Sequence, residues 1–381
     1  MEKFDVVICG AGPAGSTAAL ALGRSGLKVA MLDKDVFPRD KICGDAIAPY
    51  VPKVLATIDP AYRDALEKFE HKEMVNICRI VAPNEKVLDL EFEATGFISA
   101  RMGFDNFLFE LAAALPNITV FQNTAVKNAT VNEEAVLIET DTELSIEAKL
   151  VIGCDGAHSI INKRLTDGKI DLKHYSGAVR GYYKNVTGIP ENTFELHFLK
   201  NIIPGYFWIF PLENNVANVG LGMLSNRISR DKINLKKEML EVIQNNPYLK
   251  DRFTGAEMIG EIKGFGLPLG SRKVQLSGNR FMLCGDAASL IDPATGEGIG
   301  QAMVSGRYAG WHAIKCFEQN DFSASFMKAY DKMVYDKLWK GNRNRYYLQK
   351  LIDHFPGSLN LAANLASRSR RVHRFIEKFI V

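Results

Sequence analysis

The strongest constraint on the fold is at the N-terminus, where an apolar strand runs directly into a glycine-rich turn. Residues 6–9 are Val-Val-Ile-Cys, and residues 10–15 have the pattern G-x-G-x-x-G. A helical run over 16–26 follows, and then a second apolar strand over 28–32 that ends in Asp33. This order of strand, turn, helix and strand predicts a βαβ unit that binds a dinucleotide.

Each residue of this motif has a physical role. Gly10 permits the tight turn, Gly12 lets a pyrophosphate approach the backbone, and Gly15 lets the helix pack on the sheet. Free N–H groups at the helix start, at Ala14 and beyond, face the anion. Asp33 can accept the hydroxyls of an adenosine ribose. A lone G-x-G-x-x-G is often an ordinary turn, but the flanking strands and the acid favour an adenine dinucleotide.

Two later strands also end at a small residue and an acid. Residues 150–153 lead to Asp155, and residues 280–283 lead to Asp286. After Asp286, a glycine-rich loop that includes Gly298 and Ile299 opens a helix expected over 301–316. A carboxylate suits a ribityl hydroxyl, and a helix start stabilises a group that becomes negative, such as the N1–C2=O edge of reduced flavin. Each motif alone is a common turn, but their order after a nucleotide-binding start predicts FAD.

An aromatic strand stands apart from these motifs. Tyr206, Trp208 and Phe210 alternate, so they lie on one face of a strand and form a continuous wall. Such a wall suits a long apolar substrate. At an anonymous position, three alternating aromatics are more often the core of a half-buried strand.

These motifs together resemble the FAD-dependent oxidoreductases of the para-hydroxybenzoate hydroxylase fold, and more closely the geranylgeranyl reductase family. The resemblance covers roughly residues 1–315. Residues 204–211 match the family's Y-x-W-x-F-P pattern, and residues 217–222 match its trailing V-G-x-G pattern. The resemblance implies an α/β fold with FAD as cofactor, and it makes Tyr206, Trp208 and Phe210 candidate substrate-binding residues.

A second match is the segment 41–46, Lys-Ile-Cys-Gly-Asp-Ala, which resembles the C-G-x-G segment that lies against the flavin in these reductases. The resemblance implies that Cys43, Gly44 and Ala46 contact FAD, although Ala46 replaces the usual second glycine. Cys43 is the candidate catalytic residue, since a thiol beside the flavin could deliver a proton or shape the pocket. Its alternative reading is a buried structural cysteine. By the same resemblance, Arg101 and Ala125 contact FAD, and the alternative for Arg101 is a surface arginine at a helix start.

At 381 residues the chain exceeds the usual length of about 100–200 residues for one domain. We expect a discontinuous Rossmann-type FAD-binding domain built from 1–75, 100–172 and 270–316. Segments 76–99 and 173–269 carry alternating apolar runs and are expected to form an antiparallel β-sheet substrate domain. The remainder, 317–381, is expected to be a helical segment at the C-terminus.

Charge is unevenly placed along the chain. After residue 320 there are twelve Lys or Arg against five Asp or Glu, so this segment carries +7, and the rest carries −4 to give the total of +3. A helix is expected over 367–381, and its mixture of basic and apolar residues suits peripheral contact with an anionic membrane. A solvated helix packed on the body is an equal alternative. The charge forms no groove-like pattern, which argues against nucleic-acid binding.

The six cysteines do not predict disulfides, because Cys9, Cys154 and Cys284 end expected buried strands, and no spacing suggests a metal site. No apolar run approaches the length of a membrane span and no signal peptide is apparent, so we expect a cytoplasmic protein that could lie at the inner face of the membrane. Oligomeric state has no signal in the sequence.

The sequence therefore predicts an FAD-dependent reductase that saturates C=C bonds of a prenyl or other long apolar lipid chain. No second dinucleotide motif is visible, so electrons would come from NAD(P)H docking beside the flavin or from a protein carrier. An FAD-dependent monooxygenase or halogenase of the same fold is the alternative, and a membrane scaffold with structural FAD is a weaker one. Halogenases typically have W-x-W-x-I-P in the aromatic strand, where this chain has Tyr206 and Phe210. Fold alone does not separate these chemistries.

Overall fold

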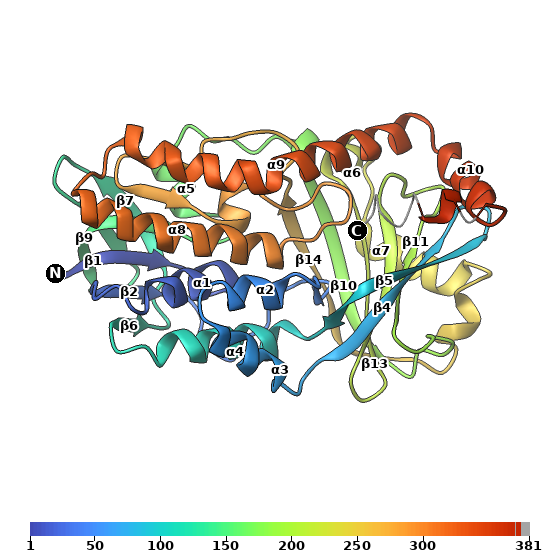
Figure 1. Cartoon of the computed structure of the whole chain (residues 1–381). Helices are drawn as coiled ribbons and strands as arrows, with labels where there is room; N and C mark the ends of the chain where they lie inside the picture. Colours follow the sequence, from blue (N-terminus) through green and yellow to red (C-terminus); the bar gives the residue numbers. More distant parts are fainter. Residues whose placement is uncertain (370, 375–381) are drawn as a thin grey trace.

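The computed structural model describes residues 1–369 and 371–374, and it contains two β-sheets joined side by side with helices packed around the first (Figure 1). The first sheet has the strand order β15-β16-β9-β1-β2-β6, with a β7–β8 hairpin attached to β9. Its strands are β1 (Glu2–Cys9), β2 (Val29–Leu32), β6 (Ile118–Phe121), β7 (Val126–Val131), β8 (Val136–Thr140), β9 (Ser145–Gly153), β15 (Ser277–Gly278) and β16 (Phe281–Leu283).

The middle of this sheet is parallel and fully apolar. β16, β9, β1, β2 and β6 pair in parallel, and Val6 to Cys9 of β1 are completely buried. Helix α1 (Pro13–Leu22) covers the sheet and packs against α4 (Arg101–Ala113) and α8 (Ile299–Gln319). This arrangement is the predicted Rossmann-type unit. Its parallel strands end together, and the glycine-rich turn after β1 lies at that edge.

The second sheet has the order β14-β10-β13-β12-β11-β4-β5-β3. Its pairs are antiparallel except for β11 with β4, which come from the two separate segments of the expected substrate domain. Its strands are β3 (Ala46–Ile47), β4 (Glu73–Val81), β5 (Val87–Ile98), β10 (Tyr175–Lys184), β11 (Thr193–His197), β12 (Tyr206–Leu212), β13 (Val216–Leu224) and β14 (Glu257–Pro268).

Both faces of β12 are buried, which explains its aromatic and β-branched composition. Phe207 and Ile209 point into a core that α7 (Leu235–Asn245) helps to close. Trp208 and Phe210 point to the opposite face. α6 (Ser225–Asp231) packs beside this sheet. Short α2 (Val51–Ala56), α3 (Pro60–Glu67) and α5 (Ile160–Leu165), with the 3₁₀ turns η1 (Leu172–His174), η2 (Lys250–Phe253) and η3 (Gly285–Ala288), complete the connections.

The C-terminal segment spans both sheets. α9 (Ala324–His354) packs on α8 and runs along the top of the molecule in Figure 1, and α10 (Gly357–Ala366) lies at the far end beside β5. The helix expected from residue 367 does not begin there, because 367 and 368 are a turn after α10, whereas 371–374 are helical. The remainder of that expected helix, 370 and 375–381, lies outside the described residues.

The expected domain boundaries stay a prediction, but the sheets show where the chain crosses between them. The first sheet takes strands from 2–9, 29–32, 118–153 and 277–283. The second takes 46–47 and 73–98 as well as 175–268, so it begins earlier in the chain than residue 76. The short strand β3 comes from the segment that carries Cys43. One of the links between the sheets, from β2 to β3, therefore contains the segment predicted to face the flavin.

Candidate active site

A cavity of about 1110 Å³ lies between the two sheets. Of the seventeen residues predicted as cofactor-binding or substrate-binding, Gly15 does not line it. The others do: Gly10, Gly12, Ala14, Asp33, Cys43, Gly44, Ala46, Arg101, Ala125, Asp155, Tyr206, Trp208, Phe210, Asp286, Gly298 and Ile299. Motifs that are up to nearly 300 residues apart in the sequence thus meet in one space.

The glycine-rich turn forms one end of the cavity. Gly10 has φ +99°, and a Cβ there would lie 2.3 Å from the carbonyl oxygen of Cys154. A Cβ at Gly15 would lie 1.8 Å from the carbonyl oxygen of Gly10, so Gly15 serves helix packing and does not reach the cavity. Helix α1 starts after Gly12, which has no side chain to cap it. The exposed N–H groups of its first turn therefore suit a pyrophosphate.

Asp33 closes the turn at the end of β2. Its Oδ2 accepts from the backbone N–H of Ala11 at 2.8 Å, and its Oδ1 accepts from the N–H of Asp35 at 3.0 Å. Burial raises the pKa of the Asp33 carboxyl by more than these two hydrogen bonds lower it. Ala125 lies across the cavity wall on the chain leaving β6, and its N–H donates to Asp141 at 2.8 Å.

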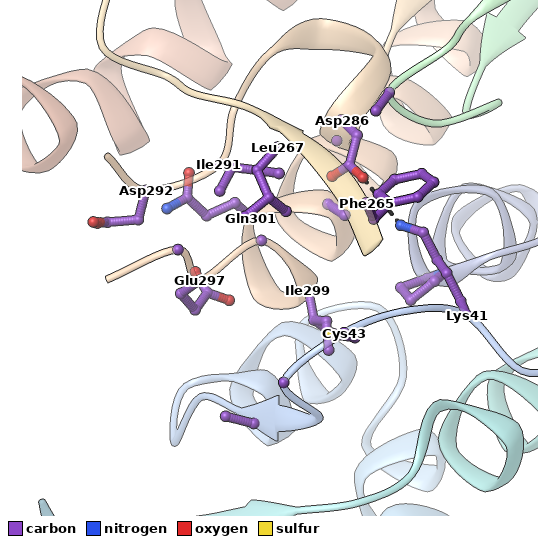
Figure 2. Close-up of a pocket in the computed structure, with 18 of the residues that line it drawn as sticks. Lys41, Cys43, Phe265, Leu267, Asp286, Ile291, Asp292, Glu297, Ile299 and Gln301 are labelled. Atoms are coloured by element: carbon purple, nitrogen blue, oxygen red, sulfur yellow. Dashed lines mark hydrogen bonds and ion pairs between the residues drawn. The ribbon is translucent and has the colours of Figure 1, made fainter. Parts of the chain in front are cut away.

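The acids of the second and third motifs have different partners. Asp155 accepts from Ser159 Oγ at 2.5 Å and from the N–H of Ile160 at 2.6 Å, so it holds the start of α5. Asp286 forms an ion pair with Lys41 Nζ at 3.0 Å, which crosses from η3 to the Cys43 segment (Figure 2). Asp286 keeps one carboxylate oxygen for a ligand, whereas Asp155 mainly shapes the loop.

The loop before α8 forms the opposite wall of the cavity. Gly298 is the N-cap of α8 and has no side chain to cap it, and Ile299 is the first helical residue. Glu297 accepts from the N–H of Gly300 at 2.7 Å and from Tyr50 Oη at 3.0 Å, and burial raises the pKa of its carboxyl. Figure 2 shows Glu297 and Ile299 on the loop that faces Cys43. This second helix start gives the cavity positive potential at another end.

Arg101 is buried, which contradicts its alternative reading as a surface arginine. It is 3% exposed and makes two bonds to Asp105, at 2.6 Å and 2.7 Å, from Nε and Nη2. Arg39 Nη1 joins the same carboxylate at 2.8 Å. Arg39 Nε also lies 3.8 Å from Asp35 Oδ2, so two carboxylates balance the charges of the two guanidinium groups. Burial raises the pKa of the Cys43 thiol, against the lowering effect of Arg101, so the thiol holds its proton.

The aromatic wall lies where the alternation predicts. The ring centroids of Tyr206 and Trp208 are 6.0 Å apart, and those of Trp208 and Phe210 are 6.1 Å apart. The wall meets the Cys43 segment directly, since a Cβ at Gly44 would lie 3.2 Å from a ring carbon of Phe210. The rings are part of a buried cluster as well as a cavity wall. The two readings of this strand are therefore compatible.

Sequence reasoning missed several residues of the cavity, and Asp45 has the most unusual surroundings among them. It is fully buried with φ +68°, and its Oδ2 accepts from Tyr182 Oη at 2.8 Å and from Asn218 Nδ2 at 2.7 Å. Asn218 in turn accepts from Trp208 Nε1 at 2.9 Å. The only local signal was its place between Gly44 and Ala46. Its partners are 137 and 173 residues away, so the pattern could not reveal them.

These features fit FAD. Two uncapped helix starts, a turn whose glycines a Cβ would block and an acid after β2 match the diphosphate and ribose, while the cavity beyond them has room for the ring system. Gly10, Gly12, Ala14 and Asp33 would hold the adenosine diphosphate. Asp286, Gly298 and Ile299 would hold the flavin side.

Comparison with known proteins supports FAD as the cofactor. The sequence model of the FAD binding domain matches residues 3–334. Digeranylgeranylglycerophospholipid reductase of Thermoplasma volcanium is 30% identical over 96% of this chain and 92% of its own length. A geranylgeranyl bacteriochlorophyll reductase-like protein of Thermoplasma acidophilum has a TM-score of 0.82 and 27% identity, covering 96% of this chain and 91% of that one.

A halogenase also shares the fold. PltM, solved in complex with phloroglucinol and FAD, has a TM-score of 0.75 at 16% identity, covering 98% of this chain and 86% of that one. At this identity the likeness concerns the fold alone. The family match and the 30% identical relative carry the assignment. The chain belongs to the FAD binding domain family and, within it, to the geranylgeranyl reductase family of FAD-dependent oxidoreductases.

Proposed function

We propose that this enzyme saturates C=C bonds in the prenyl chain of a membrane lipid. The observation that carries the proposal is the junction of the aromatic wall with the Cys43 segment. Phe210 packs on Gly44, and Trp208 is linked through Asn218 to Asp45. An apolar chain along the wall would therefore reach the flavin end of the cavity. The named relative of Thermoplasma volcanium acts on a lipid with geranylgeranyl chains.

The cavity has an apolar branch that suits such a chain. Beyond Phe210 it is lined by side chains of β4, β5 and β11, which are Val75, Cys78, Phe92, Ile98, Phe194 and Leu196. Phe194 packs edge-on against Phe210, with ring centroids 5.4 Å apart. Burial of each CH₂ group on such surfaces stabilises binding by about 0.8 kcal/mol. A long prenyl chain thus gains affinity in proportion to the length that the branch encloses.

The residues around the cavity would have different roles in the reaction. When bound and reduced by NAD(P)H or by a protein carrier, FAD would supply hydride to one carbon of the double bond. Arg101 and Lys41, held in ion pairs with Asp105 and Asp286, would line the flavin end of the cavity, and Gly298 and Ile299 would bring the start of α8 to it. Cys43 is the thiol predicted for proton delivery. Its raised pKa keeps it neutral but makes it a weak acid.

The same proposal includes peripheral contact with a membrane. Exposed apolar side chains form a stripe at Tyr347 and Leu351 of α9, at Phe355 just after α9, and at Leu361 and Leu365 of α10. Their exposed fractions are between 46% and 66%. Exposed arginines lie before and after the stripe, at 343, 368, 371 and 374. Within the described residues no helix is long and apolar enough to cross a bilayer. A surface of this kind would let the enzyme meet a lipid substrate.

The direct test of the function is a single turnover without oxygen. Dithionite-reduced enzyme is mixed with digeranylgeranyl phospholipid and other polyprenyl lipids, and mass spectrometry measures gains of two hydrogens. Trp208→Ala should weaken binding of long prenyl chains by about 3 kcal/mol at nearly unchanged FAD content. Trp339→Ala is the matched control, since Trp339 lies on α9 outside the cavity lining.

Two results would contradict the proposal. One is the absence of any gain of two hydrogens in all lipids tested. The other is oxygenated or halogenated product from the reduced enzyme in air, which would favour the monooxygenase or halogenase alternative. A Trp208→Ala protein that mainly unfolds would show that the aromatic strand serves the core alone.

A further inference from the structure

We propose that Asp45 is the proton donor in the reduction of the C=C bond. This inference rests on the proposed function and goes beyond it, because it names the acid, its supporting residues and the path of the proton.

The two carboxyl oxygens of Asp45 differ in their hydrogen bonding. Oδ2 accepts two hydrogen bonds, from Tyr182 Oη and Asn218 Nδ2. Oδ1 is buried and has no hydrogen-bond partner within residues 1–369 and 371–374. A buried polar atom without a partner is costly, so its presence in a cavity wall calls for a functional explanation. A proton on Oδ1 would have no acceptor in the described protein, and Asp45 lines the cavity into which it could be given.

The backbone at Asp45 also favours a specific role. Its φ of +68° lies in the left-handed region, which aspartate tolerates better than most residues but which still carries strain. The strained turn aligns Gly44 with Phe210 while Asn218 Nδ2 also donates to the carbonyl oxygen of Cys43 at 2.8 Å. The Cys43 segment is therefore held by two contacts, Gly44 with Phe210 and the Cys43 carbonyl with Asn218. Asp45 follows directly after Gly44.

Unlike Asp45, the other acids that line the described cavity leave no buried oxygen without a hydrogen-bond partner. Each has a donor or a cation on it, as follows: Asp33 with the N–H of Ala11, Asp35 with Arg39, Asp40 with Arg180, Asp155 with Ser159, Asp286 with Lys41, Asp292 with Arg345, and Glu297 with Tyr50 and the N–H of Gly300. Four of these pairs are ion pairs, which favour the carboxylate and not the acid. Asp45 faces no such cation at hydrogen-bond distance within the described chain.

The protonation of Asp45 fits this role. Burial raises its pKa to about 6, against the hydrogen bonds from Asn218 and Tyr182 and the positive charges of Arg180 and Arg101, which lower it. Arg180 and Tyr182 come from β10, Arg101 comes from α4, and Cys43 is the ionisable neighbour on the same segment. Asp40 neutralises Arg180 with a bond of 2.7 Å. The acid is therefore stronger than the Cys43 thiol and is still protonated in a useful fraction near neutral pH.

In this step the O–H bond of Asp45 breaks, and the π electron pair of the double bond forms a C–H bond at one alkene carbon. The other carbon would take the hydride that reduced FAD supplies when it is bound, so the alkene would gain two hydrogens while FAD, the hydride donor, is oxidised. Asp45 remains as a carboxylate, which Tyr182 and Asn218 stabilise until water returns a proton. Positive charge that develops on a trisubstituted prenyl carbon would be stabilised by the faces of Trp208 and Phe210.

The first experiment measures the acid without turnover. Difference infrared spectra of oxidised, FAD-loaded wild type against Asp45→Asn should show a carboxylic acid C=O band that disappears with a midpoint near pH 6. Tyr182→Phe removes a hydrogen bond that lowers this pKa, so the midpoint should move to higher pH. Tyr183→Phe is the matched control, because Tyr183 packs on Phe253 in the opposite core, and it should leave the midpoint unchanged. A midpoint below pH 5, or a shift in the control alone, would overturn the proposal.

The second experiment measures single turnover with a polyprenyl lipid. Asparagine also tolerates left-handed backbone, so Asp45→Asn should keep its FAD and bind the lipid within about threefold of wild type. Its rate should fall by about 10²–10⁴-fold, the usual contribution of a general acid. The wild-type rate should fall as pH rises through 6, and the fall should occur at higher pH in Tyr182→Phe. Tyr183→Phe, which alters the opposite core, should leave the rate unchanged.

The outcomes separate the two proposals. A wild-type enzyme that reduces no prenyl lipid overturns the proposed function. An Asp45→Asn enzyme that reduces the lipid at the wild-type rate overturns only the role of Asp45. Loss of the rate in Cys43→Ser with retention in Asp45→Asn would assign the proton to the thiol instead.

Discussion

Trp208 occupies its place in the cavity wall because the residue opposite it on β13 is a glycine. Gly220 pairs with Trp208 in the sheet register, and a Cβ there would lie 2.1 Å from the indole ring. Gly220→Ala should displace the ring and destabilise the protein by about 1–3 kcal/mol, as overpacking does. It should also weaken prenyl binding. Urea unfolding and lipid titration measure the two effects.

Gly222→Ala provides the control on the same strand. Its added Cβ would lie 3.4 Å from the Cβ of Ala178, an ordinary contact, so stability should stay within about 0.5 kcal/mol of wild type. Equal destabilisation by the two substitutions would mean that β13 tolerates no side chain at all. The wall would then not depend on the Gly220–Trp208 contact.

A site residue could be predicted from the sequence where its role depends on residues next to it in the chain. Gly10, Gly12 and Asp33 could be placed because strand, turn and acid follow one another directly. Asp45 could not, because its character arises from burial and from Tyr182 and Asn218 on distant strands. The position of Arg101 at a helix start likewise did not show whether its side chain is buried. Its burial depends on Asp105, which lies one turn later on the same buried face of α4 and accepts its hydrogen bond.

Helices α1 and α8 begin at the two turns that line the cavity, and they touch at small residues. A Cβ at Gly306 would lie 2.1 Å from the carbonyl oxygen of Ala14, and one at Gly310 would lie 2.6 Å from the Cβ of Ala21. Gly306→Ala meets backbone, which no side-chain rotation can relieve. We expect the two helices to separate, with a loss of about 1–3 kcal/mol in stability and a lower ratio of flavin absorbance to protein.

Gly357→Ala is the control at this scale, since it lies in α10 and its added Cβ would meet nothing within 4 Å. It should retain full flavin content. Unchanged flavin content in Gly306→Ala would show that α1 and α8 can move apart without loss of the site.

The extent of each element was predicted less well than its existence. The first helix was expected from residue 16 but begins at Pro13, because proline fits the first helical position, where no N–H partner is needed. The helix after the Gly298 loop was expected to end at Cys316 but continues to Gln319, where Asn320 adopts the left-handed conformation that ends it. The parallel pairing of β11 with β4 required two separate segments to meet, which no local pattern encodes.

At the scale of the whole molecule, the apolar stripe of α9 and α10 lies on the same segment that closes the cavity. Lys337, Asn342 and Gln349 of α9 line the cavity, whereas Leu351 and Phe355, at the end of the helix, are exposed. Ala366 of α10 packs with Cys78, Phe194 and Leu196, which line the apolar branch, so a lipid chain that leaves a bilayer at this stripe would meet the protein close to that branch. This geometry connects the proposed membrane contact with the proposed substrate.

The stripe gives a prediction for membrane binding. Wild type should sediment with phosphatidylglycerol vesicles and less with phosphatidylcholine vesicles, and added salt should weaken the binding because arginines contribute to it. The triple variant Leu351→Glu, Phe355→Glu and Leu361→Glu should lose about tenfold or more in partitioning, since each exposed side chain would otherwise bury apolar surface. Ile170→Glu with Leu172→Glu, which alters exposed apolar residues elsewhere, is the control and should bind as wild type does. Equal loss in the control would indicate nonspecific adsorption, and retained binding in the triple variant would show that α9 and α10 do not form the membrane surface.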